Sequence, residues 1–89
     1  MLTRELTINN KSGLHARPAS LWVQTASRFR SKIKIKRQDT VVDGKSILGI
    51  LSLGLSKGSI FELLVEGEDE TEAVAALEAL MIDLENQDG

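Results

Sequence analysis

Cysteine and tyrosine are absent from the 89-residue sequence, and histidine, proline and tryptophan each occur once. A chain without cysteine has no disulfide framework and no thiolate metal site, and a single histidine argues against a structural zinc site. No hydrophobic run approaches the length of a membrane span, and the first residues, MLTRELT, lack the pattern of a signal peptide. We therefore expect a cytoplasmic protein with no membrane insertion, no metal and no cofactor.

The size and composition are those of one small globular domain, residues 1–89, with 42% hydrophobic and 27% charged residues. The net charge of −2 hides an asymmetry, because all eleven Lys and Arg residues lie at or before Lys57, whereas ten of the thirteen acids lie at or after Glu62. The basic run RFRSKIKIKR contains only one aromatic residue, Phe29, in a chain that is acidic as a whole. For this run we favour a solvated sheet face over nucleic-acid binding.

Hydrophobic periodicity predicts an alternation of strands and helices. Polar and apolar residues alternate, as in strands, at residues 2–8, 32–37, 41–42 and 60–66. Helical spacing appears at residues 16–27, 47–53 and along a stripe from 73 to 84. The order β-α-β-β-α-β-α predicts an α+β domain of two layers, with three helices on one face of a sheet whose other face is solvated. The pattern does not fix the order of the strands.

Local signals mark the ends of the helices. Ser46 is a good N-cap for the short second helix, and Gly54 can end that helix. Asp69, followed three residues later by Glu72, resembles a capping box at the start of the last helix. Trp22, on the apolar face of the first helix, and Phe29 are predicted to be core or half-buried packing residues rather than cofactor contacts.

The segment SGLHARPAS, residues 12–20, places the only histidine, His15, at the start of the first helix. Pro18 fits the first turn, although Arg17, which precedes the proline, is expected to delay the regular helix. Free amides at a helix start bind anions, and Arg17 adds a cation that can grip a phosphoryl group. Gly13 lets the loop bend, and neutral imidazole is a nucleophile that can accept a phosphoryl group. An inert surface or capping histidine is the alternative.

Three segments of the chain resemble one bacterial family. GLHARPAS at residues 13–20 is similar to the active-site segment of HPr, the histidine-containing phosphocarrier family of the sugar phosphotransferase system. GKSILGILSLGLSKG at residues 44–58 resembles the regulatory-serine segment of that family, and GEDE at residues 67–70 also fits. The resemblance implies an open-faced β-sandwich, with an antiparallel sheet in the order 1-4-2-3 and three helices on one side.

The resemblance also implies a chemical role for the chain. A phosphoryl group from enzyme I would rest on Nδ1 of His15 and then pass to an enzyme IIA domain. Arg17 would assist at the phosphoryl group, and the backbone amides of Ala16 and Arg17 would hold its oxygens. The family resemblance therefore implies a monomeric carrier with a transient phosphohistidine, rather than an independent catalyst.

Ser46 has two interpretations. It can be a plain N-cap, or, as the resemblance implies, a regulatory site for HPr kinase/phosphorylase whose phosphorylated form meets a transcriptional regulator. A P-loop is excluded, because that motif needs a glycine five residues before Gly44 and position 39 is aspartate. A phosphate at an N-cap suits the helix dipole, and its charge would oppose an acidic partner.

The short second helix is expected to carry a docking patch. One or two of its apolar residues should be buried and the rest should form an exposed patch where partners dock; these residues are Ile47, Leu48 and Leu51. The chain also departs from some family members, which have lysine at the positions of Gln24, Ser27 and Gly49. Fewer cations near Arg17 imply a weaker attraction to enzyme I, or a different paralogous partner.

Three functions remain open at this point. The first is the carrier of the sugar pathway, which the sequence ILGILSLG after Ser46 favours. The second is a carrier with the same chemistry in a regulatory branch, such as the nitrogen-related phosphotransferase chain. The third is a binding module in which His15 is inert.

Overall fold

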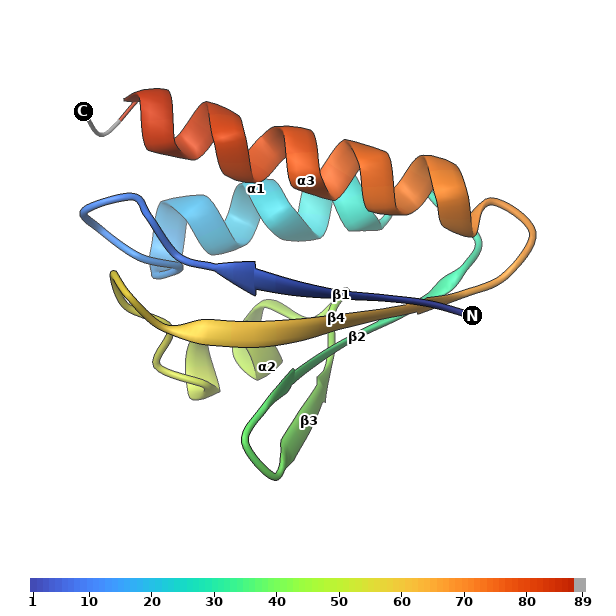
Figure 1. The fold of residues 1–89 in the computed structure, drawn as a ribbon, viewed down its shortest axis with the longest axis horizontal. Helices are drawn as coiled ribbons and strands as arrows, with labels where there is room; N and C mark the ends of the chain where they lie inside the picture. The colour runs from blue at the N-terminus through green and yellow to red at the C-terminus, as the bar shows by residue number, and fades with distance from the viewer. Residues whose placement is uncertain (88–89) are drawn as a thin grey trace.

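The computed structural model describes residues 1–87, which form four strands and three helices. Figure 1 shows how the helices are arranged around the sheet. The elements are, in chain order, β1 (Leu2–Thr7), α1 (Ala16–Ala26), β2 (Lys32–Arg37), β3 (Thr40–Asp43), α2 (Ile47–Ser52), β4 (Ile60–Glu66) and α3 (Glu70–Gln87). The predicted order of elements and the open-faced α+β architecture are confirmed. The predicted domain, residues 1–89, includes two residues that lie outside the described part of the chain.

The sheet has the strand order β1-β4-β2-β3, and every neighbouring pair is antiparallel. This order confirms the topology that the family resemblance implied. The last strand, β4, lies between β1 and β2, so the chain must cross over the sheet, and α1 and α3 run alongside each other above it (Figure 1). As a result, β1 and β3 are the two edge strands.

The core lies between the sheet and the helices. The inward residues of the two central strands are Ile33, Ile35, Phe61, Leu63 and Val65, and all of them are buried. The helices cover them with a second buried set: Ala19, Trp22, Ala26, Ile50, Ala73, Val74, Leu77, Met81 and Leu84. The Trp22 and Phe61 rings meet edge to face, with centroids 5.9 Å apart. Trp22 is therefore a core residue. The alternation of polar and apolar residues along the strands leaves the outer face of the sheet solvated.

Two helix starts differ from the sequence expectation. The first helix begins at Ala16, so Arg17 does not delay it. Pro18 lies in the first turn, where a missing N–H costs no intrahelical bond, and the Ala19 amide closes the turn by donating to the His15 carbonyl at 2.8 Å. At the start of α3 the predicted capping box paired Asp69 with Glu72. The side chain that reaches back to the preceding backbone is instead that of Glu70, whose Oε1 accepts from the Gly67 amide at 3.1 Å.

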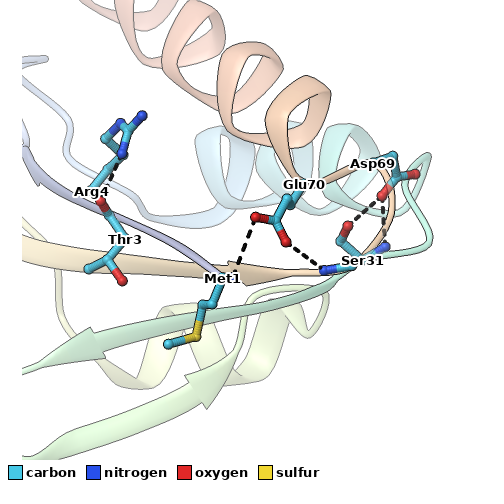
Figure 2. A network of polar contacts seen from close by, with 7 residues as sticks. Met1, Thr3, Arg4, Ser31, Asp69 and Glu70 are labelled. Carbon is cyan, nitrogen blue, oxygen red and sulfur yellow. Dashed lines mark hydrogen bonds and ion pairs between the residues drawn. The ribbon is translucent and has the colours of Figure 1, made fainter.

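Asp69 links the start of α3 to the segment before β2 (Figure 2). Its carboxylate accepts from the backbone amides of Arg30 and Ser31, at 2.9 and 3.0 Å, and from the Ser31 hydroxyl. These hydrogen bonds, the Ser31 hydroxyl foremost, hold the pKa of Asp69 below its ordinary value of 3.8. Asp69, which was predicted to take part in a capping box at α3, instead uses its carboxylate to join two segments about forty residues apart along the chain.

Among residues 1–87, no helix has both the length and the apolar character needed to cross a membrane.

Candidate functional site

The loop that precedes α1 is held against the segment that follows α2. The Leu14 amide donates to the Leu55 carbonyl at 2.8 Å, and Asn10 Nδ2 donates to the Gly13 carbonyl at 2.9 Å. Gly13 has φ of +68°, and a Cβ at this position would overlap the Leu55 carbonyl oxygen and lie 2.8 Å from Ser56 Cα. Both the backbone conformation and the close approach therefore require glycine here.

His15 is the N-cap residue of α1, with extended backbone angles (φ −99°, ψ −160°) and no side-chain cap bond. Its imidazole is exposed. Within residues 1–87, the amides of Ala16 and Arg17 have no hydrogen-bond partner, and the first turn of α1 contains no acidic residue. Among residues 1–87, therefore, nothing caps or neutralises the positive end of the α1 dipole next to the only imidazole of the chain.

Arg17 lines the same small hollow as His15. The hollow has a volume of about 130 Å³, and its other lining residues are Ser12, Pro18, Leu21, Leu84 and Gln87. The guanidinium of Arg17 is exposed and forms no ion pair within the described part of the chain. The structure therefore brings together the predicted residues His15, Ala16 and Arg17 at an open, cationic helix start.

Part of this hollow was missed by sequence reasoning. Leu84 and Gln87 come from the last turns of α3, about seventy residues after His15 in the chain. Leu84 was predicted only as the end of the apolar stripe of the last helix, and no local pattern marks Gln87. The packing of α3 beside α1 brings both residues to the site, and that packing was not evident from either helix alone.

Ser46 caps α2 as predicted. Its Oγ accepts from the Gly49 amide at 3.1 Å, and its own amide donates to the Asp43 carbonyl at 3.1 Å. Gly54 has φ of +60° and follows the C-cap residue Leu53, so the helix ends one residue earlier than expected. The first turn of α2 contains no acidic residue, which leaves its positive end without a compensating charge.

The predicted burial of the docking patch was wrong. Ile47, Leu48 and Leu51 are all exposed, at 38, 77 and 37% of their surface. The residues that anchor α2 in the core are Ile50 and Leu53. A helix of six residues presents one narrow face to the core, and Ile50 and the C-cap residue Leu53 are three positions apart on it, so the predicted trio points away from that face.

The two predicted motifs are neighbours in space. Helix α2 packs against α1 and β3, and the loop that carries His15 is bonded to Leu55, just after α2. Within residues 1–87, no group of three or more acidic or imidazole side chains is arranged to hold a metal ion.

Comparisons with known proteins agree on one family. A family model described as "PTS HPr component phosphorylation site" matches residues 2–83. The chain is 46% identical over 80 residues to phosphocarrier protein HPr of Treponema pallidum, covering 90% of this chain and 91% of the relative. It is 44% identical over 81 residues to HPr-like protein Crh of Halalkalibacterium halodurans, covering 91% and 96%. The crystal structure of HPr-C-His from Thermoanaerobacter tengcongensis superimposes with a TM-score of 0.92 and 48% identity, covering 97% of each chain.

Proposed function

Because the chain belongs to the HPr family of phosphotransferase-system phosphocarriers, we propose that His15 accepts a phosphoryl group from enzyme I and passes it to enzyme IIA domains for sugar uptake. The observation that carries this proposal is the exposed imidazole at the uncapped start of α1. The proposed location is the cytoplasm, and the protein acts as a carrier rather than as an independent catalyst.

The proposed transfer uses groups at the start of α1. The Nδ1 lone pair of neutral His15 attacks the phosphorus, an N–P bond forms, and the bond to the donor atom breaks, with the electron pair returning to the donor. The free amides of Ala16 and Arg17 can donate to the phosphoryl oxygens, and the planar fork of Arg17 can bind two of them. In this proposal the uncompensated α1 dipole stabilises the negative charge that arrives on the imidazole.

The test of the acceptor is His15→Ala, incubated with enzyme I and phosphoenolpyruvate. The wild type should gain an acid-labile, base-stable phosphate, and the variant should gain none while keeping its circular dichroism spectrum, because the side chain is exposed. Full-rate phosphorylation of the variant would exclude His15 as the acceptor.

The test of the phosphoryl clamp is the pair Arg17→Ala and Arg17→Lys. We expect the alanine variant to slow transfer while stability changes by less than about 0.5 kcal/mol, because Arg17 is exposed and forms no ion pair within residues 1–87. Lysine should recover part of the rate, since a point charge lacks the planar fork. Equal rates for both variants and the wild type would show that Arg17 is only a solvated residue.

We also propose that Ser46 is a phosphorylation site for HPr kinase/phosphorylase, whose product meets a transcriptional regulator. A phosphate here would lie at the uncompensated start of α2, in the element that carries the exposed residues Ile47, Leu48 and Leu51. We propose these three as the docking patch for enzyme I and enzyme IIA. The added charge would then oppose an acidic partner.

The variants Ser46→Asp and Ser46→Asn separate charge from local geometry, since both side chains can cap α2. Ser46→Asp should raise the KM for phosphorylation of His15, and added salt should narrow its difference from the wild type, because repulsion between exposed charges is screened over about 8–10 Å. If the asparagine variant slows transfer as much as the aspartate variant, the charge-based account of Ser46 is wrong.

A second candidate is a paralogous carrier in a regulatory branch, such as the nitrogen-related chain. The similarity to HPr-like protein Crh supports it, because it shows relatives other than HPr itself at comparable identity. The two carriers are distinguished by the rate at which each donor, the sugar-branch enzyme I or its nitrogen-branch paralogue, phosphorylates the protein. The third candidate, an inert binding module, would accept no phosphate from either donor. The monomeric state stays a prediction, and dimers of relatives have been solved.

A further inference from the structure

A basic groove lies beside β2, beyond the C-terminal end of α1. It is a hollow of about 660 Å³ lined by residues 30–34, by residues 41–43 and by Lys45. We call this hollow the basic groove. Its cations are Arg30, Lys32, Lys34 and Lys45, and its only carboxylate is that of Asp43.

The cations of the basic groove are largely unpaired. Arg30, Lys32 and Lys34 are exposed, and none of them forms an ion pair within residues 1–87. Three carboxylates lie near these cations: Glu66 opposite Lys32, Asp43 opposite Lys34, and Asp69, which accepts from the Arg30 and Ser31 amides. None of the three forms an ion pair with them within residues 1–87. Since exposed charges that lack a partner keep most of their long-range attraction, the groove offers a positive field to a negatively charged ligand.

One end of the basic groove is fixed by the turn after β3. The half-buried Lys45 ammonium donates to the Phe29 carbonyl at 2.7 Å, and the Lys45 amide donates to Asp43 Oδ1 at 2.9 Å. The Gly44 amide donates to the Ile33 carbonyl at 2.7 Å, and a Cβ at Gly44 would lie 2.6 Å from Ile33 Cγ2. The turn is therefore packed directly onto β2, and the Lys45 cation is held before any ligand arrives.

The spacing of the free cations matches an extended peptide. Lys32 and Lys34 occupy alternate positions on the outer face of β2, and Arg30 lies two residues before Lys32, in a bend outside the strand. Alternate residues of a strand recur about every 6.6–6.8 Å, which is also the spacing of alternate side chains in an extended ligand. Val41, which is 49% exposed, adds an aliphatic wall for the residues between the charges.

We propose that the basic groove binds an acidic, extended segment of a partner protein with carboxylates at alternate positions. A second copy of this chain fits less well. Its densest acidic segment has glutamates at positions 66, 68, 70 and 72, but α3 begins at Glu70, so the alternate spacing is lost halfway along it. The occupant is therefore a different protein.

This docking leaves the phosphoryl site accessible. His15 precedes the first residue of α1, whereas Arg30 follows its last residue, and eleven helical residues span about 16 Å. Figure 1 shows the two ends of α1 on opposite sides of the molecule. A partner in the basic groove should thus bind equally well whether or not His15 accepts phosphate.

The test titrates isotope-labelled full-length protein with the peptide acetyl-ETETETE-amide and follows the amide resonances by NMR. Shifts should concentrate at residues 30–34 and 41–45 and should shrink with added salt. Acetyl-TEEEETT-amide, with the same composition but contiguous glutamates, should bind several-fold more weakly. Shifts centred on residues 15–17, or equal affinity for both peptides, would overturn the proposal.

The matched variants are Lys34→Gln and Lys36→Gln, which remove one charge each from the same face of β2. Only Lys34 lines the basic groove. We expect Lys34→Gln to weaken peptide binding about two- to fivefold and Lys36→Gln to leave it unchanged within about 1.5-fold. Equal losses of peptide affinity in both variants would mean that the peptide is attracted by the overall charge of the sheet face. Concentration-dependent self-association, measured by sedimentation without peptide, would mean that a second copy of this chain occupies the groove. Either result overturns the proposal. Phosphorylation of His15 should be unaffected by either variant, so the result is independent of the proposed carrier function.

Discussion

Gly13→Ala is expected to lower the free energy of unfolding more than a glycine-to-alanine change at a positive φ where the new methyl group meets no neighbour. The backbone at Gly13 has φ of +68°, which costs an alanine about 1–2 kcal/mol. The new Cβ would also overlap the Leu55 carbonyl oxygen and approach Ser56 Cα to 2.8 Å. Both obstacles are backbone atoms, so the loop must move, at a further cost of about 1–3 kcal/mol. The sum is a loss of about 2–5 kcal/mol in the free energy of unfolding.

Gly54→Ala is the matched control. Gly54 has φ of +60°, and the nearest atom to its added Cβ is Arg37 Nη1 at 3.8 Å, so only the backbone cost of about 1–2 kcal/mol applies. Urea unfolding measures the free energy of unfolding of both variants, provided that the slope with urea concentration stays constant. The rate of phosphorylation by enzyme I measures how far the change disturbs His15, two residues after Gly13. We expect Gly13→Ala to be the less stable variant and the slower acceptor. Equal losses of stability would show that the contact between the loop and Leu55 yields without cost, and the reasoning would be wrong.

Three further predictions concern the short helix and the start of α3. Asp69→Asn should be less stable than the wild type near neutral pH, because hydrogen bonds lower the folded-state pKa of the Asp69 carboxyl. The difference in unfolding free energy exists above the unfolded-state pKa and disappears as the pH falls through the folded-state value, and urea unfolding at a series of pH values measures it. Ser46→Ala should lose about 0.5–2 kcal/mol of unfolding free energy with the cap bond to Gly49, measured by thermal and urea unfolding. Ile50→Ala, at a fully buried position, should lose about 2–5 kcal/mol of unfolding free energy. Leu48→Ala, at a position that is 77% exposed, should lose less than about 0.5 kcal/mol. If the docking patch is correct, Leu48→Ala should nevertheless weaken binding to enzyme I.

The fold was predictable because its local signals agree with one another. The alternation of Lys and Ile in β2 puts Ile33 and Ile35 into the core and Lys32 and Lys34 into water, as the structure shows. The helices that cover the sheet show apolar spacing in the sequence, and Ser46 and Gly54 mark the ends of the shortest one. Strand order was different, because it depends on pairing between distant segments and came only from the family resemblance.

The errors lie where a short segment leaves more than one local solution. In α2, six residues contain four large apolar side chains, so composition alone does not say which of them turn inward. Contact with α1 and β3 decides in favour of Ile50. At the start of α3, Asp69 and Glu70 both have carboxylates, and the reach of Asp69 to Ser31 is a long-range contact that no cap motif encodes.

The candidate site shows the same division between local and distant information. A local motif supplies His15, the free amides after it and Arg17, and this is why the sequence alone predicts the proposed chemistry. The position of that motif depends on Leu55, whose carbonyl receives the Leu14 amide and excludes any side chain at Gly13. Leu55 belongs to the second motif, some forty residues later, so neither motif builds the site alone. A histidine in the same local sequence, without the segment after α2 to hold its loop, would have the acceptor but no fixed helix start at which to present it.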